Sequence, residues 1–308
     1  MSIIKNRHYF FILSGLAVLV SLFFIITKGF NYGVDFTGGS LIEIHASETS
    51  SQDILTKLEG MENSKELVGS VKVQSSENNQ FIIRTRELND EAHTKVTQEL
   101  SSLKDFRENG FTRIGPVVGD HLKSRAIQGV VVALIVLILF VWWSFRKIPA
   151  GISAFRFGFV AAVPTLIHDV IITMGVFAWR GLELDSFFIT AILTVFGFSI
   201  NDTIVVFDRI REALIRRTHS NFEEVCEYAV KSTFRRSLNT SLTILLTLFA
   251  LYFFASSSIQ NFVLALIIGI GVGTYSSLFI ATPLLLTWEN MVQKNKKSVV
   301  VTKKAKHK

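Results

Sequence analysis

Three charged residues interrupt or border long apolar segments of the sequence. Asp202 lies within Ser186–Phe207, Asp169 lies in the middle of Phe157–Trp179, and Arg236 begins a third apolar segment. A carboxylate in the hydrocarbon region of a bilayer is costly unless it is paired, hydrated or protonated. Acidic groups at such positions are therefore typical of a protein that moves something across a membrane, and a simple anchor does not need them.

Polar residues recur at helical spacing around these charges. The three stripes consist of Thr165, Asp169 and Thr173; of Thr190, Thr194, Gly197 and Asn201 beside Asp202; and of Arg236, Asn239, Thr240, Thr243 and Thr247. A stripe of this kind leaves donors unsatisfied if it faces lipid, so each should face another helix, water or a partner. The hydroxyls alone favour simple contacts between helices, whereas an ionised Asp202 is an expensive contact and favours function.

Arg236 has two interpretations. It can be a positively charged residue at the cytoplasmic end of a span, with its long side chain reaching the interface. Alternatively, it can be the partner of Asp202 on the adjacent antiparallel helix, because the two helices share one short connection.

The elements that position these residues are predicted to be membrane helices. Of the 308 residues, 49% are hydrophobic, and the mean hydropathy is +0.41. A span needs about 20 mostly apolar residues, and the uncharged run Ser237–Trp288 is too long for one, so it should fold back at Ser256–Asn261. We therefore expect six spans, four of them in Tyr9–Thr27, Ala126–Phe145, Phe157–Trp179 and Ser186–Phe207 and two in the long run. A signal peptide competes with a retained anchor for the first segment.

The distribution of Lys and Arg predicts how the chain is oriented. Basic residues border one set of span ends, and seven lysines fall in the tail Lys294–Lys308, which accounts for the net charge of +7. Under the positive-inside rule both termini are cytoplasmic and the protein is a multi-pass protein of the inner (plasma) membrane. A basic tail beside a membrane favours contact with anionic lipid over nucleic acid.

Residues 31–120 are predicted to form one exported domain between the first helix (residues 1–30) and the remaining helices (121–290), which precede the tail (291–308). The expected elements are a strand at Gly39–His45, a helix at Ser51–Gly60 capped by Ser51, strands at Ser70–Ser76 and Gln80–Arg86, a helix at Asn89–Phe106 and a strand at Phe111–Val118. This βαββαβ order is that of a small ferredoxin-like α+β domain.

Two further segments carry structural expectations. The connector Arg209–Arg235 is amphipathic and is expected to lie on the membrane surface. Gly269, Gly271 and Gly273 include a small-xxx-small pair, which favours close packing of helices.

Several kinds of function are excluded. The single cysteine, Cys226, allows neither an intrachain disulfide nor a thiolate cluster, and His45, His93 and His121 lack metal-ligand spacing. There is no lysine-containing phosphate loop, so ATP is not the direct energy source. We expect no cofactor, no metal and no enzymatic activity.

Four local sequences together resemble one known family. They are VDFTGG at Val34–Gly39, IHDVIIT at Ile167–Thr173, SINDTIVVFDRIRE at Ser199–Glu212 and RSLNTS at Arg236–Ser241. From about Lys5 to Trp288, the chain closely resembles the SecF branch of the SecD/SecF family, in the resistance-nodulation-division superfamily.

The resemblance implies a function and partners. A protein of this branch pairs with a SecD subunit beside the SecYEG channel, sometimes with a small accessory membrane protein of the YajC type, and uses the proton gradient to assist translocation of unfolded secretory polypeptides. The family's proton pathway corresponds to Asp202, Arg236 and Thr240, and with Asn201 and Asp169 these form the expected proton relay.

Two other functions stay open at this point. Related exporters of the superfamily use protons to move lipids or small hydrophobic molecules, but they usually carry both halves in one chain. A purely structural scaffold for SecD is the third possibility.

Overall fold

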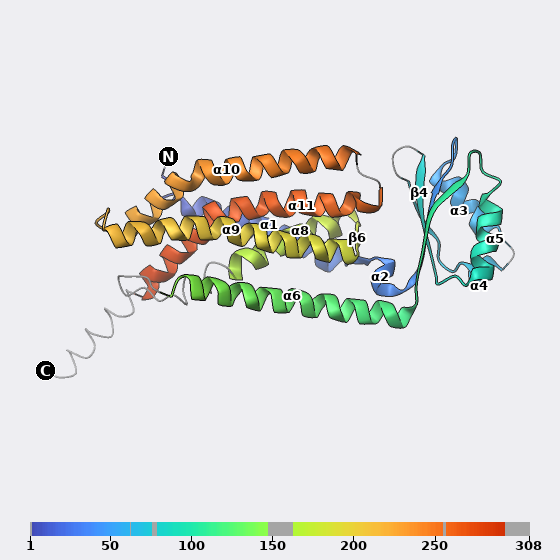
Figure 1. Ribbon diagram of the computed structural model, residues 1–308, viewed down its shortest axis with the longest axis horizontal. Helices are drawn as coiled ribbons and strands as arrows, with labels where there is room; N and C mark the ends of the chain where they lie inside the picture. Colours follow the sequence, from blue (N-terminus) through green and yellow to red (C-terminus); the bar gives the residue numbers. More distant parts are fainter. Residues whose placement is uncertain (1, 62, 76–78, 147–162, 255–256, 293–308) are drawn as a thin grey trace.

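The computed structural model describes residues 2–61, 63–75, 79–146, 163–254 and 257–292. Long helices form a bundle, and a small sheet domain lies at one end of it (Figure 1). The first residues of α1 and the end of the helical run near Val292 lie at the opposite end of the bundle. The chain is therefore a mostly helical protein with one α/β extension.

The bundle contains the predicted apolar segments. Its helices are α1 (Arg7–Lys28), α6 (Pro116–Ser144), α8 (Val163–Arg180), α9 (Ser186–Arg216), α10 (Phe222–Phe254) and α11 (Ser257–Ser276), and the last continues through the π-helical turn η2 (Ser277–Ala281) to Val292. In the described part of the chain, five helices are long and apolar enough to cross a membrane, namely α1, α6, α9, α10 and Ile259–Val292. The predicted span at Phe157–Trp179 begins outside the described residues, so six spans stay a prediction.

Two predicted segments differ from the structure. The connector Arg209–Arg235 was expected to lie on the membrane surface, but most of it continues the two long helices, because α9 runs to Arg216 and α10 begins at Phe222. Ion pairs one turn apart, such as Arg216–Glu212, support the extension, and apolar residues of the segment enter the bundle core. In the predicted turn Ser256–Asn261, residue 256 lies outside the described residues and the rest begins α11.

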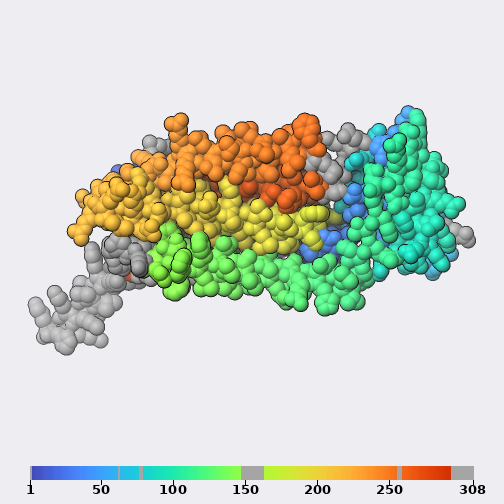
Figure 2. All heavy atoms as spheres, viewed as in Figure 1, coloured from blue at the N-terminus to red at the C-terminus, as the bar shows by residue number. Residues whose placement is uncertain are grey.

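Glycines bring pairs of helices into close contact. A side chain on Gly175 of α8 would lie 2.3 Å from Ser21 of α1, and one on Gly269 of α11 would lie 2.3 Å from Val195 of α9. The packing predicted for Gly269 and Gly273 is thus confirmed, whereas Gly271 faces open space. Figure 2 shows α9 between α6 and α10 on the visible face.

The extension contains a four-stranded antiparallel sheet. Its strands are β2 (Gly39–His45), β3 (Lys72–Ser75), β4 (Gln80–Thr85) and β5 (Arg107–Ile114), in the order β3-β4-β2-β5, and its helices are α3 (Ser51–Glu59), α4 (Ser64–Leu67) and α5 (Asp90–Leu100). Alternate apolar residues of the strands, such as Ile42 and Ile44, pack with Ile54 and Val96 of the helices.

Three boundaries in the extension differ from the prediction. Ser50, not Ser51, caps α3, because its hydroxyl accepts from the Asp53 N–H while the Asp53 carboxylate accepts from the Ser50 N–H. The last strand was predicted at Phe111–Val118, but β5 ends at Ile114. Helix α6 begins at Pro116, well before the predicted Ala126, because proline is preorganised for the first turn of a helix.

The extension contacts the bundle through short elements. Strand β1 (Asn31–Tyr32) pairs in parallel with β6 (Glu183–Leu184), and α2 (Val34–Thr37) packs against α6. Gly38 and Gly39, with φ of +73° and +142°, connect α2 to β2. A side chain on Gly38 would lie 2.7 Å from Pro116, and one on Gly39 would lie 2.6 Å from the Thr85 carbonyl, so both positions require glycine.

Candidate functional site

Asp202 lies between α9 and α10 and is only 6% exposed. Its Oδ1 accepts a hydrogen bond of 2.5 Å from the Ser237 hydroxyl of α10. Its Oδ2 is buried and has no hydrogen-bond partner among the described residues. A buried carboxylate oxygen without a donor is costly while it is charged, so this atom is a natural place for a proton.

Arg236 precedes Ser237 on α10 and is exposed. Within the described chain, the Asp202 carboxylate accepts a hydrogen bond from Ser237 alone, and Arg236 acts on it through its charge. The structure describes no direct ion pair between Asp202 and Arg236, so their pairing stays a prediction.

Asn201 and Thr240 lie on the outer surface of the chain beside this pair. The Thr240 hydroxyl donates to the Arg236 carbonyl at 2.9 Å. The side chains of Asn201, Arg236 and Asn239 are exposed and make no hydrogen bond to any other residue that the structure describes. We call these three residues the polar surface.

The threonine stripes correct one expectation. Thr190 and Thr194 on α9, and Thr243 and Thr247 on α10, are exposed, but each hydroxyl donates to a carbonyl of its own helix. Because this bonding satisfies the donors, these hydroxyls can face lipid. The unsatisfied donors are those of the polar surface, namely the amides of Asn201 and Asn239 and the guanidinium of Arg236.

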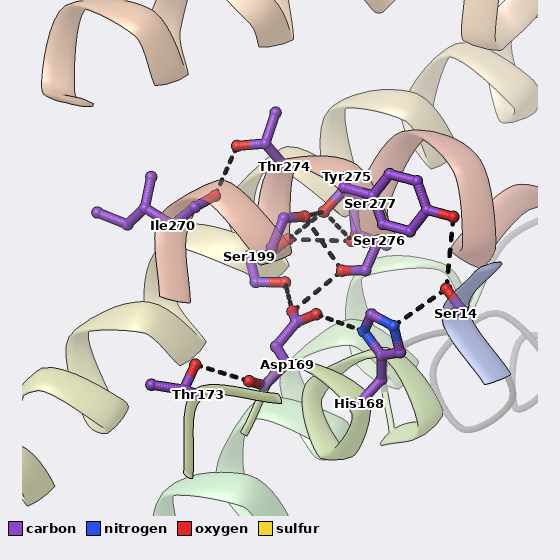
Figure 3. A network of polar contacts seen from close by, with 12 residues as sticks. Ser14, His168, Asp169, Thr173, Ser199, Ile270, Thr274, Tyr275, Ser276 and Ser277 are labelled. Carbon is purple, nitrogen blue, oxygen red and sulfur yellow. Dashed lines mark hydrogen bonds and ion pairs between the residues drawn. The ribbon is translucent and has the colours of Figure 1, made fainter. Parts of the chain in front are cut away.

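Asp169 is fully buried and lies in a second polar network (Figure 3). Its Oδ1 lies 2.9 Å from His168 Nδ1, and its Oδ2 accepts hydrogen bonds from Ser199 at 2.7 Å and Ser276 at 3.0 Å. Helices α8, α9 and α11 thus meet at one carboxylate. Thr165 and Thr173 of the same stripe are also buried, so this stripe faces the interior of the bundle, one of the three possibilities expected for it.

The network continues to α1. His168 Nε2 lies 3.1 Å from the Ser14 hydroxyl, which lies 3.5 Å from the Tyr275 hydroxyl of α11. Tyr275 in turn donates to the Phe10 carbonyl at 3.0 Å. Sequence reasoning did not single out Ser14, because its hydrogen bonds depend on which helix faces α1.

Four consecutive residues, Thr274–Ser276 of α11 and Ser277 of η2, lie between the surroundings of the two acids. Their partners lie on four different helices: Thr274 donates to Ser241 of α10, Tyr275 to Phe10 of α1, Ser276 to Asp169 of α8 and Ser277 to the Ser199 carbonyl of α9. Ser241 then donates to the carbonyl of Ser237, the partner of Asp202. The π-helical turn η2 begins at Ser277, and such turns are frequent at functional sites.

Sequence reasoning missed the serines that hold both acids, namely Ser237, Ser199 and Ser276. Serine is common in membrane helices, and only Ser237 carried a signal, because it follows Arg236. In the described part of the chain, no group of three or more His, Cys, Asp or Glu residues could hold a metal ion.

Two family models match the chain. Residues 94–291 match the model described as protein export membrane protein SecD/SecF, C-terminal, and residues 23–50, which include Gly38 and Gly39, match the SecD/SecF GG motif.

Curated relatives agree with these matches. The chain is 36% identical to protein translocase subunit SecF of Thermobaculum terrenum, over 94% of each chain, and 39% identical to that of Haemophilus influenzae, over 90% of this chain and 82% of the relative. It is 32% identical to protein translocase subunit SecDF of Thermus thermophilus over 86% of this chain, but this covers only 35% of that longer protein.

A solved structure has the same arrangement. The crystal structure of SecDF from Thermus, described as a translocon-associated membrane protein, superposes with a TM-score of 0.83 at 31% identity and covers 94% of this chain and 39% of that one. SecDF in a super-membrane-facing form gives a TM-score of 0.69 at 30% identity.

Proposed function

Since the chain belongs to the SecD/SecF family of protein export membrane proteins, we propose that it is the SecF-type subunit of a protein translocase and uses the proton gradient, with a SecD-type partner, to assist translocation. One observation carries the proton step: Asp202 keeps a buried oxygen without a donor, close to the charge of Arg236. A proton on that oxygen removes the charge and with it the attraction to Arg236.

The proposed relay contains the five residues Asp202, Arg236, Thr240, Asn201 and Asp169. The first four cluster on α9 and α10. Asp169 connects to this cluster through Ser199, whose carbonyl accepts from Thr203, the neighbour of Asp202. One elementary charge crossing the membrane potential supplies about 2.3 kcal/mol per 100 mV, enough to shift the packing of two helices between arrangements of similar energy.

Helix α9 is the proposed path from the proton to the exported domain. It carries Asp202, and at its other end the Ser186 N–H donates to the Asp35 carboxylate at 2.9 Å. Just before α9, Glu183 forms an ion pair with Arg84 of β4 at 2.6 Å. A shift of α9 on protonation would therefore pull on the sheet domain.

A SecD-type subunit is the proposed partner of the polar surface. Asn201, Arg236 and Asn239 are exposed where lipid offers no hydrogen bonds. In the Thermus thermophilus and Brucella abortus SecDF proteins the matching region covers 35% and 34% of one longer chain, which supports a partner in the remainder.

The finer architecture is also a proposal. We propose six spans, a ferredoxin-like exported domain at 31–120, and cytoplasmic termini in the inner membrane. The strand order β3-β4-β2-β5 with α3 and α5 on the sheet supports the domain assignment. The SecYEG channel, a YajC-like accessory protein and unfolded secretory polypeptides are the further proposed partners.

The replacement Asp202→Asn tests the proposal. Asparagine keeps the shape of aspartate and still accepts from Ser237, but it cannot bind and release a proton. We expect the variant to assemble with the SecD-type subunit and to lose the uncoupler-sensitive stimulation of export of a secreted substrate. Asp208→Asn, at an exposed position on the same helix, is the matched control and should export normally.

The opposite result would leave a structural scaffold. Suppose that Asp202→Asn supports export that is as fast and as uncoupler-sensitive as that of the unmodified chain. Asp202 would then only join helices, because the amide of the asparagine would serve as well as the carboxylate.

A further inference from the structure

His168 and Asp169 share a hydrogen bond of 2.9 Å at 8% and 0% exposure. We propose that the two residues bind a proton as a pair. When the pair gains a second proton, the hydrogen bond between Ser14 of α1 and Tyr275 of α11 changes, and with it the contact between these two helices. The inference deepens the proposed proton-driven function, in which Asp169 is a relay residue without a named proton partner.

His168 separates Asp169 from a groove at the surface of the bundle. His168 lies at an open groove of about 260 Å³ between α1, α8 and α11, whose wall includes Leu13, Ala17 and Gly271. Asp169 lies behind the imidazole and is fully buried. His168 therefore lies between the groove and the carboxylate with one ring nitrogen on each side, so a proton that enters from the groove passes through His168.

Figure 3 shows His168 between Asp169 and Ser14, with one ring nitrogen bonded to each. Which atom donates in these two hydrogen bonds depends on the number of protons on the pair. With one proton on the pair, Nδ1–H donates to Asp169 and Nε2 accepts from the Ser14 hydroxyl. With two protons, Nε2–H donates to Ser14, and the second proton lies between Nδ1 and Asp169. An imidazole nitrogen is a donor or an acceptor according to its protonation, so Ser14 must reverse its direction.

The reversal at Ser14 changes the contact between α1 and α11. The Ser14 hydroxyl has one hydrogen, so it donates to Tyr275 only when it does not donate to His168. Tyr275 already donates to the Phe10 carbonyl, so it can only accept from Ser14. Its ring is held by Phe279 at a centroid distance of 5.4 Å, and the hydrogen bond to Ser14 is therefore made or lost at a fixed position.

Few other titratable groups face the pair. From α1 it meets Ser14, from α9 Ser199, and from α11 Ser276, and these three are neutral hydroxyls. Tyr275 is the other titratable member of this network in the described chain, and its ring centroid lies 6.4 Å from that of His168. Asp202 follows Ser199 by three residues on α9 and is the nearest acid in sequence on that helix.

Nuclear magnetic resonance tests the inference on the complex with the SecD-type subunit in lipid nanodiscs. The seven histidines are labelled with ¹⁵N and the five tyrosines with ¹³C at the phenol carbon, and the variants His168→Asn and Tyr275→Phe assign the signals. As the pH falls, we expect His168 to gain a proton at Nε2 and the Tyr275 signal to shift with the same midpoint.

Ser14→Ala separates the two parts of the inference. His168 should still titrate in this variant, but the Tyr275 shift should be lost. Ser21→Ala, at another buried serine of α1, is the matched control and should keep both changes. The inference is overturned if His168 holds one protonation state over the pH range in which the complex stays folded, or if Tyr275 still follows His168 without Ser14.

The nuclear magnetic resonance titration of His168 and Tyr275 is independent of the export assay. In Asp202→Asn we expect His168 and Tyr275 to titrate together even though export is lost. If that variant exports normally, the proposed role of Asp202 fails, while the His168 and Tyr275 signals still decide the inference on the pair.

Discussion

At the residue scale, the two oxygens of Asp202 have different surroundings. Oδ1 is bonded to Ser237, whereas Oδ2 has no donor among the described residues. A proton can therefore add to Oδ2 without breaking the hydrogen bond between α9 and α10. The charge of Asp202 then changes while its contact with Ser237 is kept, so the helices can return to the same arrangement after the proton is released.

Arg236 should be needed for its charge. In Arg236→Met we expect proton-driven export to fall about tenfold, the factor that corresponds to 1.4 kcal/mol of lost interaction, because Asp202 loses the cation that favours its ionised form. Arg236→Lys keeps the charge and should retain part of the activity. Export of a secreted substrate with and without an uncoupler measures the difference, and equal activity of the two variants would contradict the prediction.

At the scale of the elements, α9 and α10 present two kinds of polar group. Exposed threonines bond to their own helix, but the side chains of Asn201, Arg236 and Asn239 make no hydrogen bond in the described chain. Only the second kind leaves donors unsatisfied, which is costly where they face hydrocarbon. The end of α11 and the start of η2 have a different role, because residues Thr274–Ser277 bond to four other helices and hold the bundle together.

Residues of the polar surface and threonines that bond to their own helix should respond differently to substitution. Asn239→Leu removes an amide from the polar surface, and we expect less SecD-type subunit to copurify in mild detergent. Thr243→Val has a similar shape and removes only a hydroxyl that bonds within α10, so it should leave assembly unchanged. Loss of the partner in both variants, or in neither, would argue against this surface.

At the scale of the whole molecule, the sheet domain is held at the start of α9. Burial raises the pKa of Glu183 above its ordinary value, although the charges of Arg84 and Lys72 oppose the shift. Burial also raises the pKa of Asp185. Both carboxyl groups therefore favour the protonated form more strongly when the domain is docked than when they are in water.

The raised pKa of Glu183 determines how docking of the sheet domain depends on pH. The contribution of Glu183 to docking is complete below its ordinary pKa and is lost as the pH rises through the raised value. We expect the docked population to increase on acidification from neutral pH, and Glu183→Gln to reduce this dependence.

Distances between spin labels at Ser102→Cys and Arg180→Cys, in a Cys226→Ala background, report docking. Glu66→Gln, at an exposed position, is the control. A docked population that falls on acidification would contradict the prediction.

The orientation of the whole chain can be tested with single cysteines. In the Cys226→Ala background, Ser102→Cys in the sheet domain should react with an impermeant maleimide added to intact cells. Ser220→Cys, between α9 and α10, should react only after permeabilisation. Both positions are exposed, so reaction of both in intact cells would refute the topology.

The sequence by itself determined the elements and the chemistry of the site. Apolar segments of membrane length predicted the helices, alternation predicted β2 at its observed limits, and the cost of charge at membrane depth singled out Asp202 and Asp169. Each of these signals is local, because it depends on the residue type and on the period of one helix or strand.

Only the tertiary structure decided which groups hold the two acids. Ser237, Ser199 and Ser276 are ordinary serines in the sequence, and their bonds to Asp202 and Asp169 depend on how α8, α9, α10 and α11 pack. Packing also extended α9 and α10 beyond the predicted spans, because their apolar faces continue into the core. Periodicity indicates that a face is polar or apolar, but only the arrangement of the helices determines which residue it meets.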